Sequence, residues 1–183
     1  MATVAESDVI TGVYIADPTV HRDERGIFVE TYRREWFPGG REMVQGNRAN
    51  RQAGALVGLH YHLHQADYWY VPYGHARVVL HDLREGGPTD GATLELDLTG
   101  ENHFGVFIPP GVAHGFASLT DVVLTYLVDG YYNAADELGV AWDDPAIAGD
   151  WGVSDPVLSD RDRANPRAAD VADAVRPRWG LRT

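Results

Sequence analysis

One stretch of this sequence reads Gly54-Ala-Leu-Val-Gly-Leu-His60-Tyr-His62-Leu-His64-Gln-Ala-Asp67, and it carries more chemical information than any other. Its three histidines alternate. In an extended strand, residues two apart project from the same face, so we expect His60, His62 and His64 to share one face. Asp67 follows five residues after His62. The pattern predicts a strand region whose imidazole and carboxylate groups converge on one point.

Apolar residues elsewhere occur in short bursts of strand length rather than at helical spacing. Gly, Pro, Asp or Asn separate the bursts, which are residues 12–16, 27–32, 68–71, 76–81, 93–98, 106–108 and 122–128. Strands that recur in this way, with turn residues between them, are typical of a sandwich or a small barrel. No ten-residue amphipathic pattern interrupts them, so the sequence predicts an all-β fold.

Composition and charge exclude several classes of function. The chain has 183 residues, with 15 Lys and Arg against 27 Asp and Glu, which gives a formal net charge of −12. A surface this acidic repels nucleic-acid phosphates and anionic lipid headgroups, so we expect no nucleic acid and no membrane as partner. The longest nearly apolar run, residues 122–128, is far shorter than the roughly 20 residues of a membrane helix. The N-terminus lacks an export signal, which predicts a cytoplasmic protein.

The length and the turn pattern predict a single domain over residues 1–183, with a core at about 10–162 and a C-terminal tail over 163–183. The turn-rich segment 86–91 is interpreted as a hairpin connection between two strands. Residues 171–175 fit either a short helix or a loosely packed tail. Because the chain has no cysteine, any metal ion must be held by histidine and carboxylate.

The spacing of the histidine segment resembles the first motif of the cupin superfamily, with Gly54, His60-x-His62, Asp67 and Gly74 in the expected order. Pro109-x-Gly111-x-x-His114 resembles the core of the second cupin motif. The resemblance implies a cupin jelly-roll barrel with short peripheral helices, whose mouth is lined by His60, His62, Asp67 and His114. Three imidazoles and one carboxylate suit Fe(II), Mn(II), Ni(II) or Zn(II). The alternative, in which these histidines are only half-buried polar residues, stays open because spacing alone does not show that side chains meet.

A closer resemblance extends from about His21 to Asp162. Several segments look like those of the dTDP-4-dehydrorhamnose 3,5-epimerase family and stand in the same order: Asp23-Glu-Arg-Gly26-x-Phe28-x-Glu30, Val44-Gln45-x-Asn47, Gly58-Leu-His60-Tyr61, Pro109-x-Gly111-x-Ala-His114-Gly-Phe116, Tyr126 with Tyr131-Tyr132, Trp142-x-Asp144-Pro145 and Leu158-Ser-x-x-Asp162. This resemblance implies a homodimeric enzyme of deoxysugar biosynthesis. It would act on a thymidine-diphosphate (dTDP) 4-keto-6-deoxy sugar and require no cofactor.

The epimerase resemblance also implies roles for single residues. His60 would be the base that removes a proton beside the ketone, Asp162 would orient it, and Tyr126 would return a proton on the opposite face. These roles fit the chemistry, because inversion needs a base on one side of the ring and an acid on the other. The substrate-binding residues implied in the same way are Arg25 toward the diphosphate, Glu30, Gln45 and Asn47 on the nucleotide side, and His114 and Tyr132. The alternative that Arg25, Glu30, Gln45 and Asn47 only hold turns or strand edges stays open.

Departures from the family pattern favour a second interpretation. The arginine that usually precedes Gly-Leu-His is Val57 here, and the usual lysine is Asp67. The usual glutamine after His-Tyr is His62, so these changes recreate the cupin metal-ligand set of His60, His62, Asp67 and His114. A divalent ion could then polarise a ketone oxygen in place of the missing cations. His60 cannot serve both as an inner-sphere ligand and as a free base.

Three hypotheses about function follow from the sequence. The first is an isomerase that epimerises a nucleotide-linked 4-keto-6-deoxy sugar, and the length of the resemblance favours it. The second is a metal-dependent oxygenase, cyclase or lyase acting on a small natural product, which the ligand set favours. The third is a sugar- or nucleotide-binding cupin without catalysis, because Val57 and Val78 stand where the family has charged residues.

Overall fold

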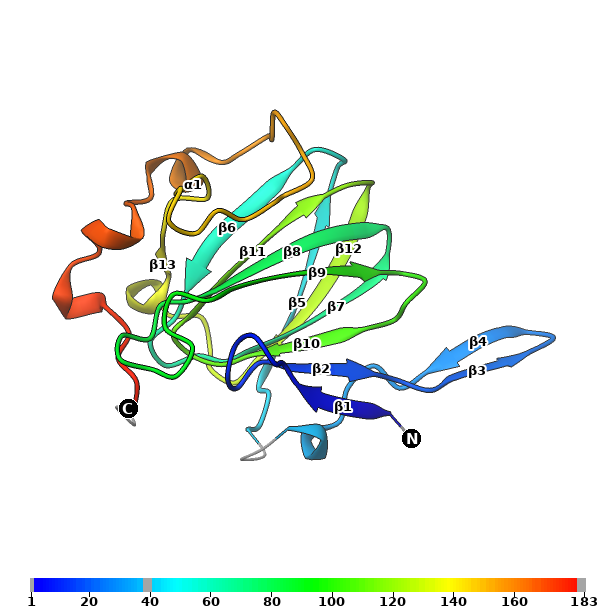
Figure 1. The fold of residues 1–183 in the computed structure, drawn as a ribbon. Helices are drawn as coiled ribbons and strands as arrows, with labels where there is room; N and C mark the ends of the chain where they lie inside the picture. The colour runs from blue at the N-terminus through cyan, green and yellow to red at the C-terminus, as the bar shows by residue number, and fades with distance from the viewer. Residues whose placement is uncertain (1, 38–40, 181–183) are drawn as a thin grey trace.

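The computed structural model describes residues 2–37 and 41–180, which form two facing antiparallel β-sheets (Figure 1). The larger sheet has the order β1 (Thr3–Glu6), β2 (Tyr14–Asp17), β10 (Gly105–Ile108), β7 (Asp67–Tyr73), β12 (Val122–Val128) and β5 (Gln45–Arg51). The second sheet has the order β13 (Leu138–Gly139), β6 (Leu56–Tyr61), β11 (Val112–Ser118), β8 (His75–Asp82) and β9 (Thr93–Thr99). The predicted all-β jelly-roll class is confirmed.

Strand β8 shows why these layers pack together. Ala76, Val78 and Leu80 alternate along it and are fully buried in the core between the two sheets. Val79 lies between them in sequence and packs into a second cluster with Val171 of the C-terminal segment. A strand that is apolar on both faces must be covered on both faces. The second sheet is therefore sandwiched between the larger sheet and the C-terminal part of the chain.

The helices are short and lie outside the sheets, as the sequence predicts. They are η1 (Arg34–Trp36), η2 (Ala134–Asp136), α1 (Asp160–Ala164), η3 (Ala168–Asp170) and η4 (Asp173–Val175). Within residues 171–175, a short helix covers only Asp173–Val175, and Val171 is only 5% exposed, so this region packs against the rest of the chain. Among the described residues, no helix is long and apolar enough to cross a membrane.

Strand register brings the two histidine motifs side by side. In the β11–β6 pair, His114 lies opposite His60, and in the β11–β8 pair it lies opposite Leu80. Asp67 begins β7 in the facing sheet, where it lies opposite Val128. Residues far apart in the sequence thus meet at one end of the barrel.

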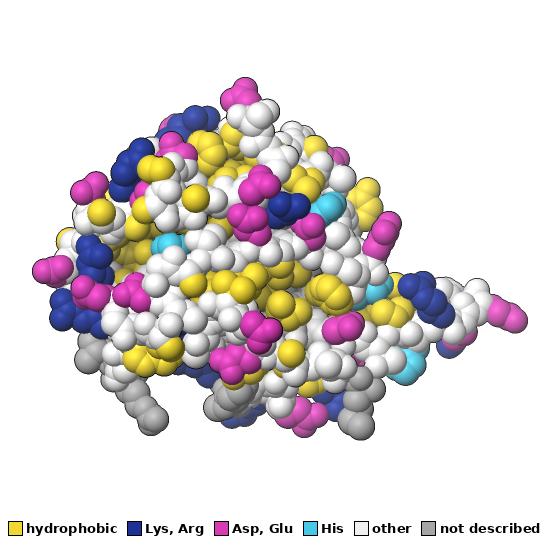
Figure 2. All heavy atoms as spheres, viewed as in Figure 1, with side chains coloured by type: hydrophobic (Ala, Val, Ile, Leu, Met, Phe, Trp, Pro, Cys, Tyr) yellow, Lys and Arg dark blue, Asp and Glu magenta, His cyan; other side chains and the backbone are white. Residues whose placement is uncertain are grey.

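A two-stranded arm extends away from the barrel. It consists of β3 (Val20–Asp23) and β4 (Gly26–Val29), and Figure 1 shows it projecting beyond the sheets. Ile27 and Phe28 on this arm are 51% and 65% exposed. On the face of the molecule shown in Figure 2, acidic side chains are spread widely, in keeping with the net charge of −12. The arm therefore presents apolar side chains to its surroundings without support from the core.

The strand predictions succeed at apolar runs and miss strands made of polar or small residues, including the fully buried β11. The burst at 122–128 coincides with β12, and the turn-rich segment 86–91 connects β8 to β9 as predicted. The sequence pattern missed β5, which reads Gln-Gly-Asn-Arg-Ala-Asn-Arg. This strand lies at the edge of the larger sheet and pairs only with β12. An edge strand with much exposed surface does not need the apolar residues that mark a buried one.

Candidate active site

Five of the predicted site residues, His60, His62, Asp67, His114 and Tyr126, line a cleft between the two sheets, with about 540 Å³ of empty space. Its walls come from β5, β6, β7, β11 and β12. The lining residues are Ala49, Arg51, Val57, His60, His62, Gln65, Asp67, Trp69, His114, Phe116, Leu124, Tyr126 and Glu137. Both sheets contribute apolar side chains and titratable groups to this lining, a mixture that is usual in a small-molecule site.

His60 and Asp162 form a close pair at one wall of this cleft. His60 Nε2 lies 2.6 Å from Asp162 Oδ1, and the Asp162 side chain is only 5% exposed. Ser159 holds the carboxylate from behind, because its hydroxyl donates to Asp162 Oδ2 over 2.8 Å and accepts from the Asp162 backbone N–H at the start of α1. This short helix thus fixes the position of the acidic partner.

The charge state of the pair follows from these contacts. Burial alone would raise the pKa of Asp162, but the hydrogen bond and the positive charge of His60, helped by Ser159, bring it below its ordinary value. Asp162 is therefore a carboxylate at neutral pH, and it accepts a hydrogen bond from Nε2–H of His60. When the His60 ring is neutral, its lone pair is then on Nδ1, which suits a general base.

Tyr126 approaches the cleft from the opposite sheet. It lies on β12, where its neighbours across the strands are Asn47 and Trp69. Burial raises the pKa of Tyr126, and the charges of Asp67 and Glu137 raise it further. The phenol therefore keeps its proton at neutral pH and can donate it. His60 and Tyr126 occupy opposite walls, which is the arrangement that inversion requires.

Three other predicted residues form a compact buried cluster. Nitrogen and oxygen atoms of His62, Asp67 and His114 all lie within 4.8 Å of one another, and each side chain is nearly excluded from solvent. Burial lowers the pKa of His114 to about 4, although the Asp67 carboxylate opposes this effect and His62 reinforces it. His114 is consequently a neutral imidazole at physiological pH.

Two expectations about the histidines are wrong. His60 does not belong to the compact cluster, because its Nε2 is turned to Asp162 instead. His64 does not share the face of His60 and His62, since it is exposed and does not line the cleft. The reason is that β6 ends at Tyr61, so the strict alternation of an extended strand does not continue as far as position 64.

The predicted nucleotide-side residues lie in two places, on β5 and on or next to the β3–β4 arm. Gln45 and Asn47 lie on β5, where Gln45 Nε2 donates to Asn47 Oδ1 over 3.0 Å. Gln45 Oε1 accepts a 3.2 Å hydrogen bond from the backbone N–H of Tyr132, whose side chain is 69% exposed. These three residues form a polar edge beside Tyr126 on the neighbouring strand.

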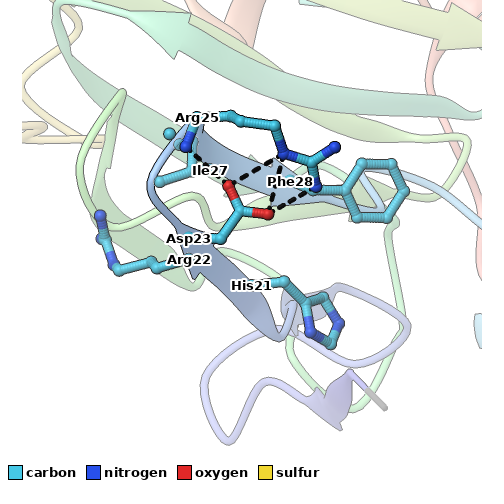
Figure 3. A pocket seen from close by; sticks show the side chains of 7 residues that line it. His21, Arg22, Asp23, Arg25, Ile27 and Phe28 are labelled. Atoms are coloured by element: carbon cyan, nitrogen blue, oxygen red, sulfur yellow. Dashed lines mark hydrogen bonds and ion pairs between the residues drawn. The ribbon is translucent and has the colours of Figure 1, made fainter.

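Arg25 and Glu30 are not brought together with the cleft. Arg25 lies in the turn of the β3–β4 arm with its side chain 90% exposed, and it pairs with Asp23 over 2.5 Å (Figure 3). Glu30 follows β4 and pairs with Arg33. In a single chain, neither residue lines the cavity that contains His60.

Several lining residues were not predicted from the sequence. Trp69 donates from Nε1 to Asp67 Oδ2 over 3.0 Å, and Gln65 Nε2 donates to Asp67 Oδ1 over 2.9 Å. Trp69 stands two residues from Asp67 on β7, so strand alternation carried a signal that would have found it, whereas Gln65 lies between β6 and β7, where no such signal exists. Glu137 also lines the cleft, but it follows η2 and no local pattern marks it.

Comparison with known proteins agrees with this geometry. The family model for dTDP-4-dehydrorhamnose 3,5-epimerase matches residues 7–170. The enzyme of that name from Shigella flexneri is 37% identical over 161 residues, covering 84% of this chain and 89% of the relative. The one from Neisseria gonorrhoeae is 38% identical over 159 residues, covering 83% of this chain, which spans only 48% of that relative's length.

A solved structure shows the same architecture. The dTDP-6-deoxy-D-glucose-3,5-epimerase of Legionella pneumophila, in complex with dTDP-4-keto-L-rhamnose, superposes with a TM-score of 0.92 at 31% identity and covers 98% of this chain and 99% of that one. These similarities favour an epimerase over a metal-dependent oxygenase, cyclase or lyase. With this fold, this cleft and these relatives, the chain belongs to the dTDP-4-dehydrorhamnose 3,5-epimerase family of sugar-nucleotide epimerases.

Proposed function

We propose that this protein epimerises a dTDP-linked 4-keto-6-deoxy sugar, with His60 as base, Asp162 as its positioning partner and Tyr126 as acid. The observation that carries the proposal is the position of the His60–Asp162 pair on one wall of the cleft and of a protonated tyrosine on the other. A sugar ring held between these walls presents one face to each group. Family membership supplies the substrate class.

The proposed reaction consists of two proton transfers. The neutral imidazole takes the proton from the carbon beside the ketone, and the electron pair of the broken C–H bond forms an enolate. The Tyr126 phenol then gives its proton to the same carbon from the other face as the ketone re-forms. This leaves an imidazolium and a phenolate, and a proton passing through solvent restores both. The carboxylate of Asp162 stabilises the imidazolium while it exists.

The remaining residues of the proposed substrate site lie toward the nucleotide. Gln45, Asn47 and Tyr132 form a polar edge beside Tyr126, and in the proposed complex they offer amide and phenol groups to the nucleoside. His114 borders the sugar side. Arg25 has a guanidinium suited to paired phosphate oxygens, but its exposed position on the arm means that a single chain does not bring it to the cleft.

The homodimer implied by the family resemblance accounts for the exposed arm. Ile27 and Phe28 expose apolar surface that a second copy of the chain would cover. The expected result is a dimer mass in sedimentation equilibrium, and a monomer with Ile27→Ser and Phe28→Ser together. A wild-type monomer across the concentration range would contradict the dimer. A cytoplasmic location stays a prediction.

Proton exchange in deuterated water tests the reaction directly. With dTDP-4-keto-6-deoxyglucose as substrate, NMR should show deuterium entering beside the ketone, and the signals identify whether one or two carbons react. His60→Ala should slow this exchange by about 100- to 10,000-fold, because the base is lost. Tyr126→Phe should keep exchange on one face but lose inversion, since only the second donor is removed. These different outcomes separate the two roles.

The control is His64→Ala, because His64 is an exposed histidine outside the cleft and should leave the rate unchanged. A wild-type protein that binds dTDP yet exchanges no proton would refute the proposed reaction and favour the non-catalytic sugar-nucleotide binder.

A further inference from the structure

The Nδ1 atoms of His62 and His114 each contact a backbone carbonyl oxygen. His62 Nδ1 lies 2.7 Å from the carbonyl oxygen of Asp136, and His114 Nδ1 lies 2.9 Å from that of Val112. A carbonyl oxygen can only accept, so both Nδ1 atoms donate. In a neutral imidazole the lone pair is then on Nε2. Both rings therefore have a fixed tautomer with a metal-ligating nitrogen left over.

The two Nε2 atoms face one carboxylate. His62 Nε2 is 3.9 Å from Asp67 Oδ1, and His114 Nε2 is 3.9 Å from Asp67 Oδ2. Gln65 and Trp69 hold this carboxylate with one hydrogen bond to each oxygen. Two imidazoles and a carboxylate, each 3–5% exposed, thus converge on one point. When both imidazoles are neutral, their lone pairs face the carboxylate, and a cation between the three groups offsets the repulsion.

We propose that His62, Asp67 and His114 bind a divalent transition-metal ion. Two imidazoles and a carboxylate suit Fe(II), Mn(II), Co(II), Ni(II) or Zn(II) better than Mg²⁺ or Ca²⁺, which prefer oxygen ligands throughout. Ligands bonded at about 2.1 Å to one ion lie roughly 3.0–3.4 Å apart. Each His–Asp pair must then close by about 0.5–0.9 Å, which small side-chain rotations provide.

This three-residue site is compatible with a base at position 60. His60 is excluded from the ligand set because Asp162 occupies its Nε2, so a metal ion and the His60–Asp162 pair can coexist in one cleft. The positive charge is also needed there. Among the described lining residues, Arg51 is the one arginine or lysine, whereas Asp67 and Glu137 are acidic. A bound ion would supply charge that polarises a substrate oxygen.

Binding of an ion by these three residues does not depend on the proposed epimerase function. Only the use of the ion in catalysis rests on that function. Binding is tested with the full chain after removal of metal by a chelator and titration with Co(II). We expect one Co(II) per chain and visible ligand-field absorption of a site with nitrogen and oxygen ligands. Asp67→Asn and His114→Gln should each weaken Co(II) binding on the order of 100-fold or more, because each removes one of the groups that bind the ion.

One control variant changes a histidine outside the cluster, and the other keeps a carboxylate at position 67. His64→Gln removes an exposed histidine outside the cluster and should bind Co(II) like the wild type. Asp67→Glu keeps the carboxylate and should retain measurable binding. If Asp67→Asn does not fold, as judged by near-ultraviolet circular dichroism, His62→Gln provides the test, since its amide can still donate to the Asp136 carbonyl.

Two results would overturn the metal site: no Co(II) or Zn(II) binding by the wild type, or unchanged affinity in the folded ligand variants. The exchange assay distinguishes this failure from failure of the proposed function. Proton exchange without metal binding would refute the metal site alone, and Co(II) binding without any exchange would refute the epimerase alone.

Discussion

The imidazole of His60 makes a close hydrogen bond to the carboxylate of Asp162. The 2.6 Å contact with Asp162 fixes the tautomer of the ring, and the Ser159 hydroxyl fixes Asp162 in turn. The carboxylate does not touch the substrate in the proposed reaction. Its effect is to keep the proton on Nε2 and to stabilise the charge that His60 acquires, which makes Asp162 a positioning residue.

Replacing Asp162 by asparagine should lower kcat by about 100- to 10,000-fold and change KM little. The amide cannot stabilise an imidazolium, and it can donate a proton to Nε2 and thereby favour the wrong tautomer. Steady-state kinetics measure this split between kcat and KM. Asp160→Asn is the control, since Asp160 begins the same helix but is exposed. Equal losses in both variants would show a helix defect rather than a role for Asp162.

Part of this residue-scale picture was accessible from the sequence. The spacing of His62, Asp67 and His114 predicted a cluster, and the structure forms it. The spacing could not predict that His60 lies outside the cluster, because its partner Asp162 is 102 residues away in sequence. Only the family resemblance linked Asp162 to His60. Local periodicity contains no information about which of two long-range partners a side chain selects.

Among the elements, β6 and β11 approach each other unusually closely. A Cβ atom on Gly58 would lie 2.6 Å from Gly115 Cα and 2.7 Å from the carbonyl oxygen of His114. Gly58 also has a φ of +113°, which other residues rarely adopt. This close contact sets the separation of the strands that carry His60 and His114.

Substitution of Gly58 by alanine should destabilise the fold by roughly 2 kcal/mol or more, through backbone strain and steric overlap. It should also reduce catalysis in the protein that still folds, because β6 moves away from β11. Urea denaturation and the deuterium-exchange assay measure the two effects. Gly54→Ala is the control: Gly54 has a φ of +84°, but a Cβ there meets nothing within 4 Å. Similar losses in both variants would mean that strain, not strand separation, dominates.

Whether a strand was predictable depended on an apolar run in its sequence, since the buried strand β11, which reads Val-Ala-His-Gly-Phe-Ala-Ser, was not among the predicted bursts. Strand β12 was found because it is largely buried and reads as an apolar run, whereas the polar edge strand β5 was missed. The burst at 27–32 was shortened, since β4 ends at Val29. Its apolar residues Ile27 and Phe28 are exposed on the arm, so an apolar pattern there did not indicate a core strand.

On the scale of the whole molecule, the C-terminal segment is a third layer. It covers the outer face of the second sheet, and Asp144 helps to hold it in place. Asp144 is 4% exposed and accepts hydrogen bonds from the backbone N–H groups of Ala146 and Ala168, at 3.0 and 2.8 Å. One carboxylate thus joins the loop after β13 to the first residue of η3.

The Asp144 contacts predict a pH dependence of stability. Burial would raise the pKa of Asp144, but the two backbone hydrogen bonds and Arg167 bring it below the ordinary 3.8. Because the folded pKa is depressed, the stabilisation is fully present above about pH 4 and is lost as the pH falls through the folded value. Asp144→Asn should therefore cost about 1–3 kcal/mol in the free energy of unfolding at pH 7. The cost should shrink at pH 3.

Urea unfolding of wild type and variant at both pH values measures this difference. Asp173→Asn is the control, because the Asp173 side chain is 89% exposed and should change stability little at either pH. A cost for Asp144→Asn that stays constant between pH 7 and pH 3 would contradict the assigned pKa direction.

The His60–Asp162 pair spans two layers, with the base on the barrel and its carboxylate on the outer covering. Opening of that covering would separate the two and would also expose Val79 and the other apolar side chains on the outer face of the second sheet. The contact on which turnover is proposed to depend is therefore tied to the packing that stabilises the sheet. Loss of that packing should reduce activity and stability together.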